Sequence, residues 1–366
     1  MTSPAEALGE RDEVDGLLLP ITLELSPIRN LLIIDLADDP TYRTLEPQVL
    51  AEPGGERVVL LAYRHDDHVE LYAPPESGVD ASGYDGLGEG LLGLHHAPFE
   101  QARFEVTADG LQLDLAVTAT NGRRFDLHIH EHLSGGRDRF PVLAPVGGTF
   151  ETPTFFPFLW LPGLSFVPVR GTEVDVRVGG QRRRIPRIPL PIGGRRCLMA
   201  RYDPDVLVCQ LNPDSAGVAP RVPVPADDAR SGADVDIVEV EEGIAVAAVR
   251  VARGAHTCAA RLDPPLPDLA SLPVPARRSG ELLLQADGAT ELRARYDLTR
   301  GEQQVEMVID RFGPWRTRSR RPLLALLFRL PLFRAWPTTY RWESTLEFHA
   351  TSQPVLHARW SRSSLR

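Results

Sequence analysis

The chain has 366 residues, of which 43% are hydrophobic and 25% are charged, and its formal net charge is −10. This composition is typical of a soluble globular protein, and the length suffices for two domains that each bury a core. The acidic balance argues against a nucleic-acid partner, because no surplus of cations is available to neutralise phosphates.

The N-terminal segment, residues 1–16, is polar and acidic and ends in GERDEVDG. We expect it to be disordered, and it lacks the basic and apolar blocks of a signal peptide. No run in the chain approaches the ~18 apolar residues of a membrane-spanning helix. Cys197, Cys209 and Cys258 form no CxxC pair and are interpreted as buried, reduced thiols. A cytoplasmic location is the prediction.

Short runs with alternating apolar and polar residues dominate the rest of the chain, and they predict an all-β fold. Examples are ERVVLLAYR at 56–64, LQLDLAVTA at 111–119 and VEMVID at 305–310. Between the first two lies a glycine-rich segment, GYDGLGEG, that contains Tyr84. It is either a plain flexible loop or a loop at the mouth of a binding pocket, where Tyr84 would contact a ligand.

The most informative stretch is RFDLHIHEH at residues 124–132. A strand sends alternate side chains to opposite faces, so one face of this strand carries Asp126, His128, His130 and His132. The function that we expect depends on whether this face meets water or a pocket.

The dipeptide Asn121-Gly122 precedes this strand and is typical of a two-residue hairpin turn. Such a turn pairs the histidine strand with the leucine-rich strand before it, and directly opposed residues share a face. The histidines would then face inward together with Leu113, Leu115 and Val117. A one-residue bulge would reverse this register, placing the histidines in solvent and the intervening Phe125, Leu127 and Ile129 in the core.

Inward-facing histidines predict acid–base chemistry that requires no cofactor. His128 would carry a proton, Asp126 would orient its ring, and His130 would provide a second polar contact. An alternative is a mononuclear metal site, because alternate residues of a strand lie ~6.6–7 Å apart and both imidazoles could bind one ion. His132 is too far from His128 to join them, so His95 or His96 would supply a third ligand. A histidine-rich face that is solvated or packed at an interface is the remaining interpretation.

The two halves of the chain resemble each other, which predicts an internal duplication. ADGLQLDLAVTATNGRRFDLHIHEH at 108–132 aligns with ADGATELRARYDLTRGEQQVEMVIDRF at 286–312, and WLPGLSFVP at 160–168 aligns with RLPLFRAWP at 329–337. In the second copy, core residues Met307 and Ile309 correspond to His128 and His130. We expect two antiparallel barrels in tandem, one over residues 17–170 with an apolar connector and one over 171–366.

This layout resembles the tandem lipocalin-like proteins, which include carotenoid hydratases, AttH-type proteins and some natural-product cyclases. The resemblance covers most of the chain but concerns architecture only, so it assigns no role to any residue. It implies two lipocalin-like barrels and a hydrophobic ligand.

Two apolar stretches, 154–166 and 320–336, occupy equivalent places in the two copies and are interpreted as packing pieces between them. The second follows an arginine-rich run and is also a candidate for peripheral membrane contact. Overall, the sequence predicts a protein that binds a terpenoid- or polyketide-like molecule and acts on it as a lyase, isomerase or cyclase. A non-catalytic carrier and a metal enzyme are the alternatives.

Overall fold

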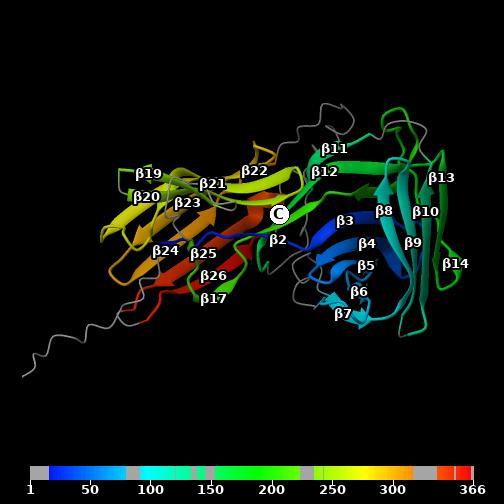
Figure 1. Cartoon of the computed structure of the whole chain (residues 1–366), viewed down its shortest axis with the longest axis horizontal. Helices are drawn as coiled ribbons and strands as arrows, with labels where there is room; N and C mark the ends of the chain where they lie inside the picture. Colours follow the sequence, from blue (N-terminus) through cyan, green and yellow to red (C-terminus); the bar gives the residue numbers. More distant parts are fainter. Residues whose placement is uncertain are drawn as a thin grey trace, which may run out of the picture.

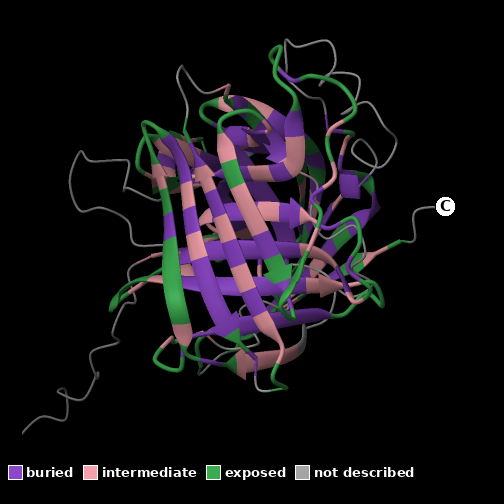
Figure 2. Cartoon of the chain, turned by 90° about the vertical axis from the view of Figure 1, so that its right-hand side faces the viewer, coloured by how far each residue is buried: buried purple, intermediate pink, exposed green. Residues whose placement is uncertain are grey.

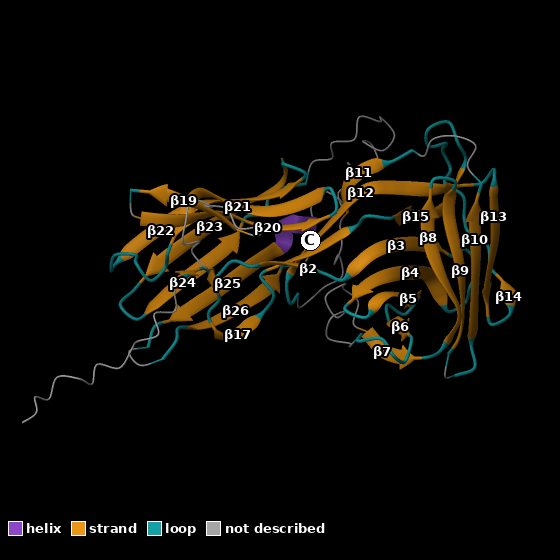
Figure 3. Ribbon diagram, viewed as in Figure 1, coloured by secondary structure: helices purple, strands orange, loops and turns teal. Residues whose placement is uncertain are grey.

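The protein is built almost entirely from antiparallel β-strands (Figures 1 and 3). Its computed structural model describes residues 16–79, 91–119, 121–132, 138–144, 153–222, 235–241, 243–315, 336–349 and 352–363. Within these ranges the helical element is a short 3-10 helix, η2 (Trp336–Thr339), and no helix is both long and apolar enough to cross a membrane. The predicted all-β fold class is confirmed.

A curled ten-stranded sheet forms the centre of the molecule (Figure 1). Its neighbours are antiparallel except for β6 and β7, which run parallel. In spatial order the strands are β2 (Leu23–Leu25), β16 (Leu207–Leu211), β12 (Phe156–Pro168), β15 (Cys197–Asp203), β3 (Ile28–Asp35), β4 (Tyr42–Glu52), β5 (Gly55–Arg64), β6 (Val69–Ala73) and β7 (Leu91–His96), with β11 (Phe140–Ala144) paired to β12.

A five-stranded sheet packs on part of this central sheet. Its order is β14 (Gln181–Arg182), β13 (Thr172–Val178), β10 (Arg124–Glu131), β9 (Gly110–Thr118) and β8 (Phe99–Thr107). Buried residues alternate with partly exposed ones along β10, so one face meets the central sheet and the other meets solvent. The shared core includes Leu113 and Phe125 from the five-stranded sheet and Leu32, Leu60 and Tyr202 from the central one. Figure 2 shows the outer face of the smaller sheet toward the viewer.

The C-terminal half forms a nine-stranded antiparallel sheet. Its order is β17 (Ser215–Val218), β26 (Val355–Arg362), β25 (Tyr340–Glu347), β24 (Gln304–Asp310), β23 (Ala289–Arg300), β22 (Ala276–Ala286), β21 (His256–Pro267), β20 (Gly243–Arg253) and β19 (Val235–Val240). A further two-stranded sheet joins β1 (Leu17–Leu18) to β18 (Arg221–Val222).

A single apolar core joins the two halves. It includes Leu31 and Phe158 of the central sheet and residues of the nine-stranded sheet such as Leu262 and Trp342. Arg253 reinforces this junction, because its guanidinium donates hydrogen bonds to the carbonyls of residues 26, 28 and 206 on the other side. The halves are therefore packed as one body around a continuous core.

The expected boundary after residue 170 does not coincide with a break between sheets. Strands β13, β15 and β16, which follow that position, pair with strands from residues 17–170, and β14 pairs with β13. The N-terminal residues expected to be disordered lie, except for Gly16, outside the described residues, as does Tyr84.

Candidate functional site

The hairpin between β9 and β10 has a three-residue loop, so the predicted two-residue turn is wrong. The amide of Ala119 donates to the carbonyl of Arg123, and Gly122, with φ +80°, donates to the carbonyl of Ala119. This is the pattern of a turn followed by a residue in the left-handed region, which favours glycine. The Asn-Gly dipeptide occupies the last two positions of the loop.

The longer loop shifts the register by one residue and reverses the faces of β10. Phe125 pairs with Val117 and Leu127 with Leu115, and these side chains are buried together. His128 pairs with Asp114 on the outer, partly exposed face. The prediction that the histidines share a pocket with Leu113, Leu115 and Val117 is therefore wrong. Phe125, Leu127 and Ile129 fill the interior, because their burial removes more apolar surface from water.

Two histidines nevertheless converge on one carboxylate (Asp114) on this outer face. Nδ1 of His128 lies 2.7 Å from Oδ1 of Asp114, and Nε2 of His130 lies 2.8 Å from Oδ2. The two imidazole rings lie 4.0 Å apart between centroids. Burial alone raises the pKa of Asp114, but the hydrogen bonds from both rings outweigh it and leave the pKa below its usual value.

Asp126, the predicted partner of His128, has a different role. Its carboxylate pairs with Arg124 at 2.8 Å, whereas Asp114 on the neighbouring strand takes the predicted position. The sequence contained a signal for Asp114, because this charged residue stands between Leu113 and Leu115 in LQLDLAVTA and therefore belongs to the outward-facing side of the strand. That position could be recognised only with the correct register.

The remaining predicted histidines lie elsewhere. His95 on β7 stacks on Tyr72, with ring centroids 5.2 Å apart, and does not approach His128. His132 lies beyond the end of β10, with Nε2 3.7 Å from a carboxylate oxygen of Glu173. Neither His95 nor His96 therefore supplies the third ligand that the metal hypothesis required. Of the stretch 320–336, only Trp336 lies within the described residues, so its predicted membrane contact remains a prediction.

No family model, curated protein or solved structure matches this chain. The structure shows an all-β chain with curled sheets, which is compatible with a barrel-like architecture (Figure 1).

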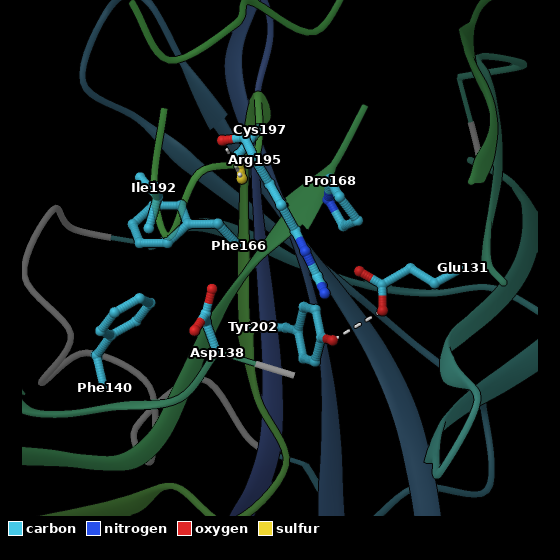
Figure 4. Close-up of a pocket in the computed structure, with 9 residues that line it drawn as sticks. All are labelled: Glu131, Asp138, Phe140, Phe166, Pro168, Ile192, Arg195, Cys197 and Tyr202. Atoms are coloured by element: carbon cyan, nitrogen blue, oxygen red, sulfur yellow. Dashed lines mark hydrogen bonds between the residues drawn. The ribbon is translucent and has the colours of Figure 1, made fainter. Parts of the chain in front are cut away.

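A small cavity lies at the end of the five-stranded sheet, where β10, β12 and β15 meet (Figure 4). Glu131, which is fully buried, accepts hydrogen bonds from the amide of Leu111 at 2.9 Å and from the hydroxyl of Tyr202 at 2.8 Å. The side chain of Arg195 points toward this pair. The volume inside this cavity that water can occupy is ≈ 20 Å³, which is room for about one water molecule.

The burial of Glu131 was not predicted from the sequence. There it is a charged residue between two histidines, and nothing in the pattern marks it as buried. The alternation of β10 places it on the same face as Phe125 and Ile129. Gly110 leaves room for it, because a Cβ at that position would lie 2.4 Å from Cβ of Glu131. The fixed hydrogen bonds of Glu131 and the small cavity indicate a structural role at the edge of the core.

A larger groove lies at the junction of the two halves. Its volume is ≈ 210 Å³, and it is lined by Pro141, Val142, Leu143, Trp160, Asp287, Glu291 and Trp315. Each indole binds a carboxylate, because Nε1 of Trp160 donates to Asp287 at 3.1 Å and Nε1 of Trp315 donates to Glu291 at 3.4 Å. The groove thus combines apolar walls from the first half with acidic side chains from the second.

Proposed function

We propose that the protein binds a small, mainly apolar molecule in the groove between its two halves. The observation that carries this proposal is a space of ≈ 210 Å³ walled by Val142, Leu143 and two tryptophans, with Asp287 and Glu291 at its side. Apolar pockets with a few converging polar groups, located between domains, are the usual form of small-molecule sites.

The volume of the groove limits the size of its ligand. An apolar cavity of about 150 Å³ holds benzene, so ≈ 210 Å³ suits a molecule with one ring and a short substituent. The single-water cavity at Glu131 is too small for such a molecule. A ligand built on one ring fits the groove better than the extended terpenoid or polyketide expected from the sequence.

The carboxylates favour a ligand with a hydrogen-bond donor or a positive charge. Asp287 already accepts hydrogen bonds from the amide of Thr257, from His256 and from Trp160, so its carboxylate is held in a fixed orientation. Indole faces attract cations, and a carboxylate adds a Coulombic attraction. An aromatic amine therefore matches the groove better than its neutral alcohol. If this protein transforms its ligand, Asp287 and Glu291 are the acid and base that we propose, in place of His128 and Asp126.

Benzylamine and benzyl alcohol, which differ in charge and little in shape, provide the test. We expect ligand-observed NMR to detect one site for each on the full chain, with benzylamine bound more tightly. Val142→Phe fills the groove and should abolish binding, whereas Val218→Phe, at an exposed position of β17, should leave it unchanged. Near-UV circular dichroism checks that both variants fold. Equal binding by the two variants, or no binding at millimolar concentrations, would contradict the proposal.

We also propose that the two halves arose by duplication of a lipocalin-like unit. The order β8–β9–β10–β13 in one half corresponds to β22–β23–β24–β25 in the other, and each is a run of antiparallel neighbours. The aligned segments 108–132 and 286–312 contain the central pairs of these runs, β9–β10 and β23–β24, which supports a common origin. A carrier of apolar ligands is consistent with this architecture, although a fold does not determine a function.

A further inference from the structure

We propose that Asp114, His128 and His130 form a binding site for one divalent transition-metal ion on the outer face of the five-stranded sheet. One oxygen of Asp114 and one nitrogen of each histidine lie within 4.8 Å of one another. This site is separate from the groove between the halves, because it shares no residue or strand with the groove. The proposal therefore stands independently of the ligand-binding function.

The donor set determines which ions are expected. Two imidazole nitrogens and one carboxylate oxygen suit Zn²⁺, Co²⁺, Ni²⁺, Cu²⁺ or Fe²⁺, whereas Ca²⁺ and Mg²⁺ prefer oxygen ligands throughout. Three protein ligands leave one or more coordination positions for water. The three side chains are partly exposed, with 20% to 40% of their surface accessible, so these positions face solvent.

The sheet holds the three side chains in place before an ion arrives. His128 and His130 are alternate residues of β10, and Asp114 is the direct partner of His128 on β9. The carboxylate lies 2.7 and 2.8 Å from the two ring nitrogens, and ligands of tetrahedral zinc lie about 3.3 Å apart. An ion can therefore replace the two hydrogen-bond protons after small side-chain rotations, without movement of the backbone.

A neighbouring carboxylate is positioned to support the site. Oε2 of Glu173 on β13 lies 3.9 Å from Nε2 of His128, which is the nitrogen that does not face Asp114. Metal-binding histidines commonly donate the N–H of their second nitrogen to a carboxylate, which fixes the ring and increases its basicity. At 3.9 Å Glu173 forms an ion pair with the ring, and a rotation of its exposed side chain would bring it to hydrogen-bond distance. His132, 61% exposed, lies near the other oxygen of Glu173 and supplies a matched histidine outside the cluster.

Isothermal titration calorimetry tests the proposal: Zn²⁺ is titrated into the full chain after a chelator has removed any bound metal. We expect one ion per chain, with Asp114→Asn, His128→Ala and His130→Ala each weakening binding by about tenfold or more. His132→Ala should retain the wild-type affinity. Because all four side chains are partly exposed, these variants should fold, and near-UV circular dichroism verifies this.

Thermal unfolding gives a second readout, because an ion that binds only the folded state stabilises it. Zn²⁺ should raise the melting temperature of the wild type and of His132→Ala, but not that of His130→Ala. The proposal is overturned if the wild type binds no stoichiometric Zn²⁺, or if His132→Ala loses as much affinity as His130→Ala. Benzylamine binding, measured in parallel, shows independently whether the groove remains intact.

Discussion

The carboxyl group of Asp203 is fully buried, and its environment favours the protonated form. Its two oxygens accept hydrogen bonds from the amides of Gly163 and Asp205, each at 2.8 Å. These bonds lower the pKa, but burial has the larger effect and raises it to about 7. The raised pKa means that the folded protein binds this proton more tightly than the unfolded chain does.

This pKa predicts how stability changes with pH. The contribution of Asp203 is fully present below about pH 4, near the ordinary pKa of the group, and is lost as pH rises through about 7. At 1.36 kcal/mol per pKa unit, the wild type should lose about 4 kcal/mol relative to Asp203→Asn across this range. Urea unfolding of both proteins at several pH values measures the difference. Parallel pH profiles would show that Asp203 does not titrate in this way.

At the level of single elements, β10 shows how one turn decides the environment of a whole strand. With a three-residue loop before it, Phe125 packs between Tyr42 and Tyr72, at centroid distances of 5.4 and 5.1 Å. A loop one residue shorter would send Phe125 to the solvent and Asp126 into that aromatic environment.

Cysteine labelling tests the register directly. Asp126→Cys should react quickly with a thiol reagent such as DTNB in the native protein, because this position lies on the outer face. Leu127→Cys should react only on unfolding, because Leu127 is buried. The three native cysteines are buried and free, so the wild type provides a low background. If Leu127→Cys reacted faster than Asp126→Cys, the register described above would be wrong and the histidines would face inward.

The sequence predicted the strands and the alternation of faces, because these depend on local patterns. Residues such as Leu113 and Phe125 were correctly assigned to strands, and Met307 and Ile309 are buried as expected. The orientation of the histidines could not be predicted, because Asn121-Gly122 fits both a two-residue and a three-residue loop. The role of Asp114 depends on pairing across that loop, so it was missed for the same reason.

On the scale of the whole molecule, the two halves share one core and are linked through Arg253. Burial lowers the pKa of its guanidinium, and its hydrogen bonds to carbonyls of the first half compensate for the lost hydration. A continuous core and a partly buried charged link both favour unfolding of the two halves as one unit.

Replacement of this arginine should weaken the junction. Arg253→Ala leaves buried carbonyls without a charged donor, and we expect a loss of about 3 kcal/mol in unfolding free energy. Arg261→Ala, at an exposed position of β21, should change it by less than about 0.5 kcal/mol. Chemical denaturation, monitored by tryptophan fluorescence, measures both, and the wild type should show a single transition. Two separate transitions in the wild type would contradict the shared core.

The order of strands in the central sheet has a consequence for synthesis of the protein. Strand β3 pairs with β15, so that Leu32 meets Tyr202, which is translated 170 residues later. At 5–20 residues per second, a ribosome needs on the order of ten seconds or more to supply this partner. During that time one hydrogen-bonding edge of an apolar strand is exposed in the nascent chain, where it can pair with other chains. Slow translation or low chaperone capacity should therefore reduce the yield of folded protein at this early stage.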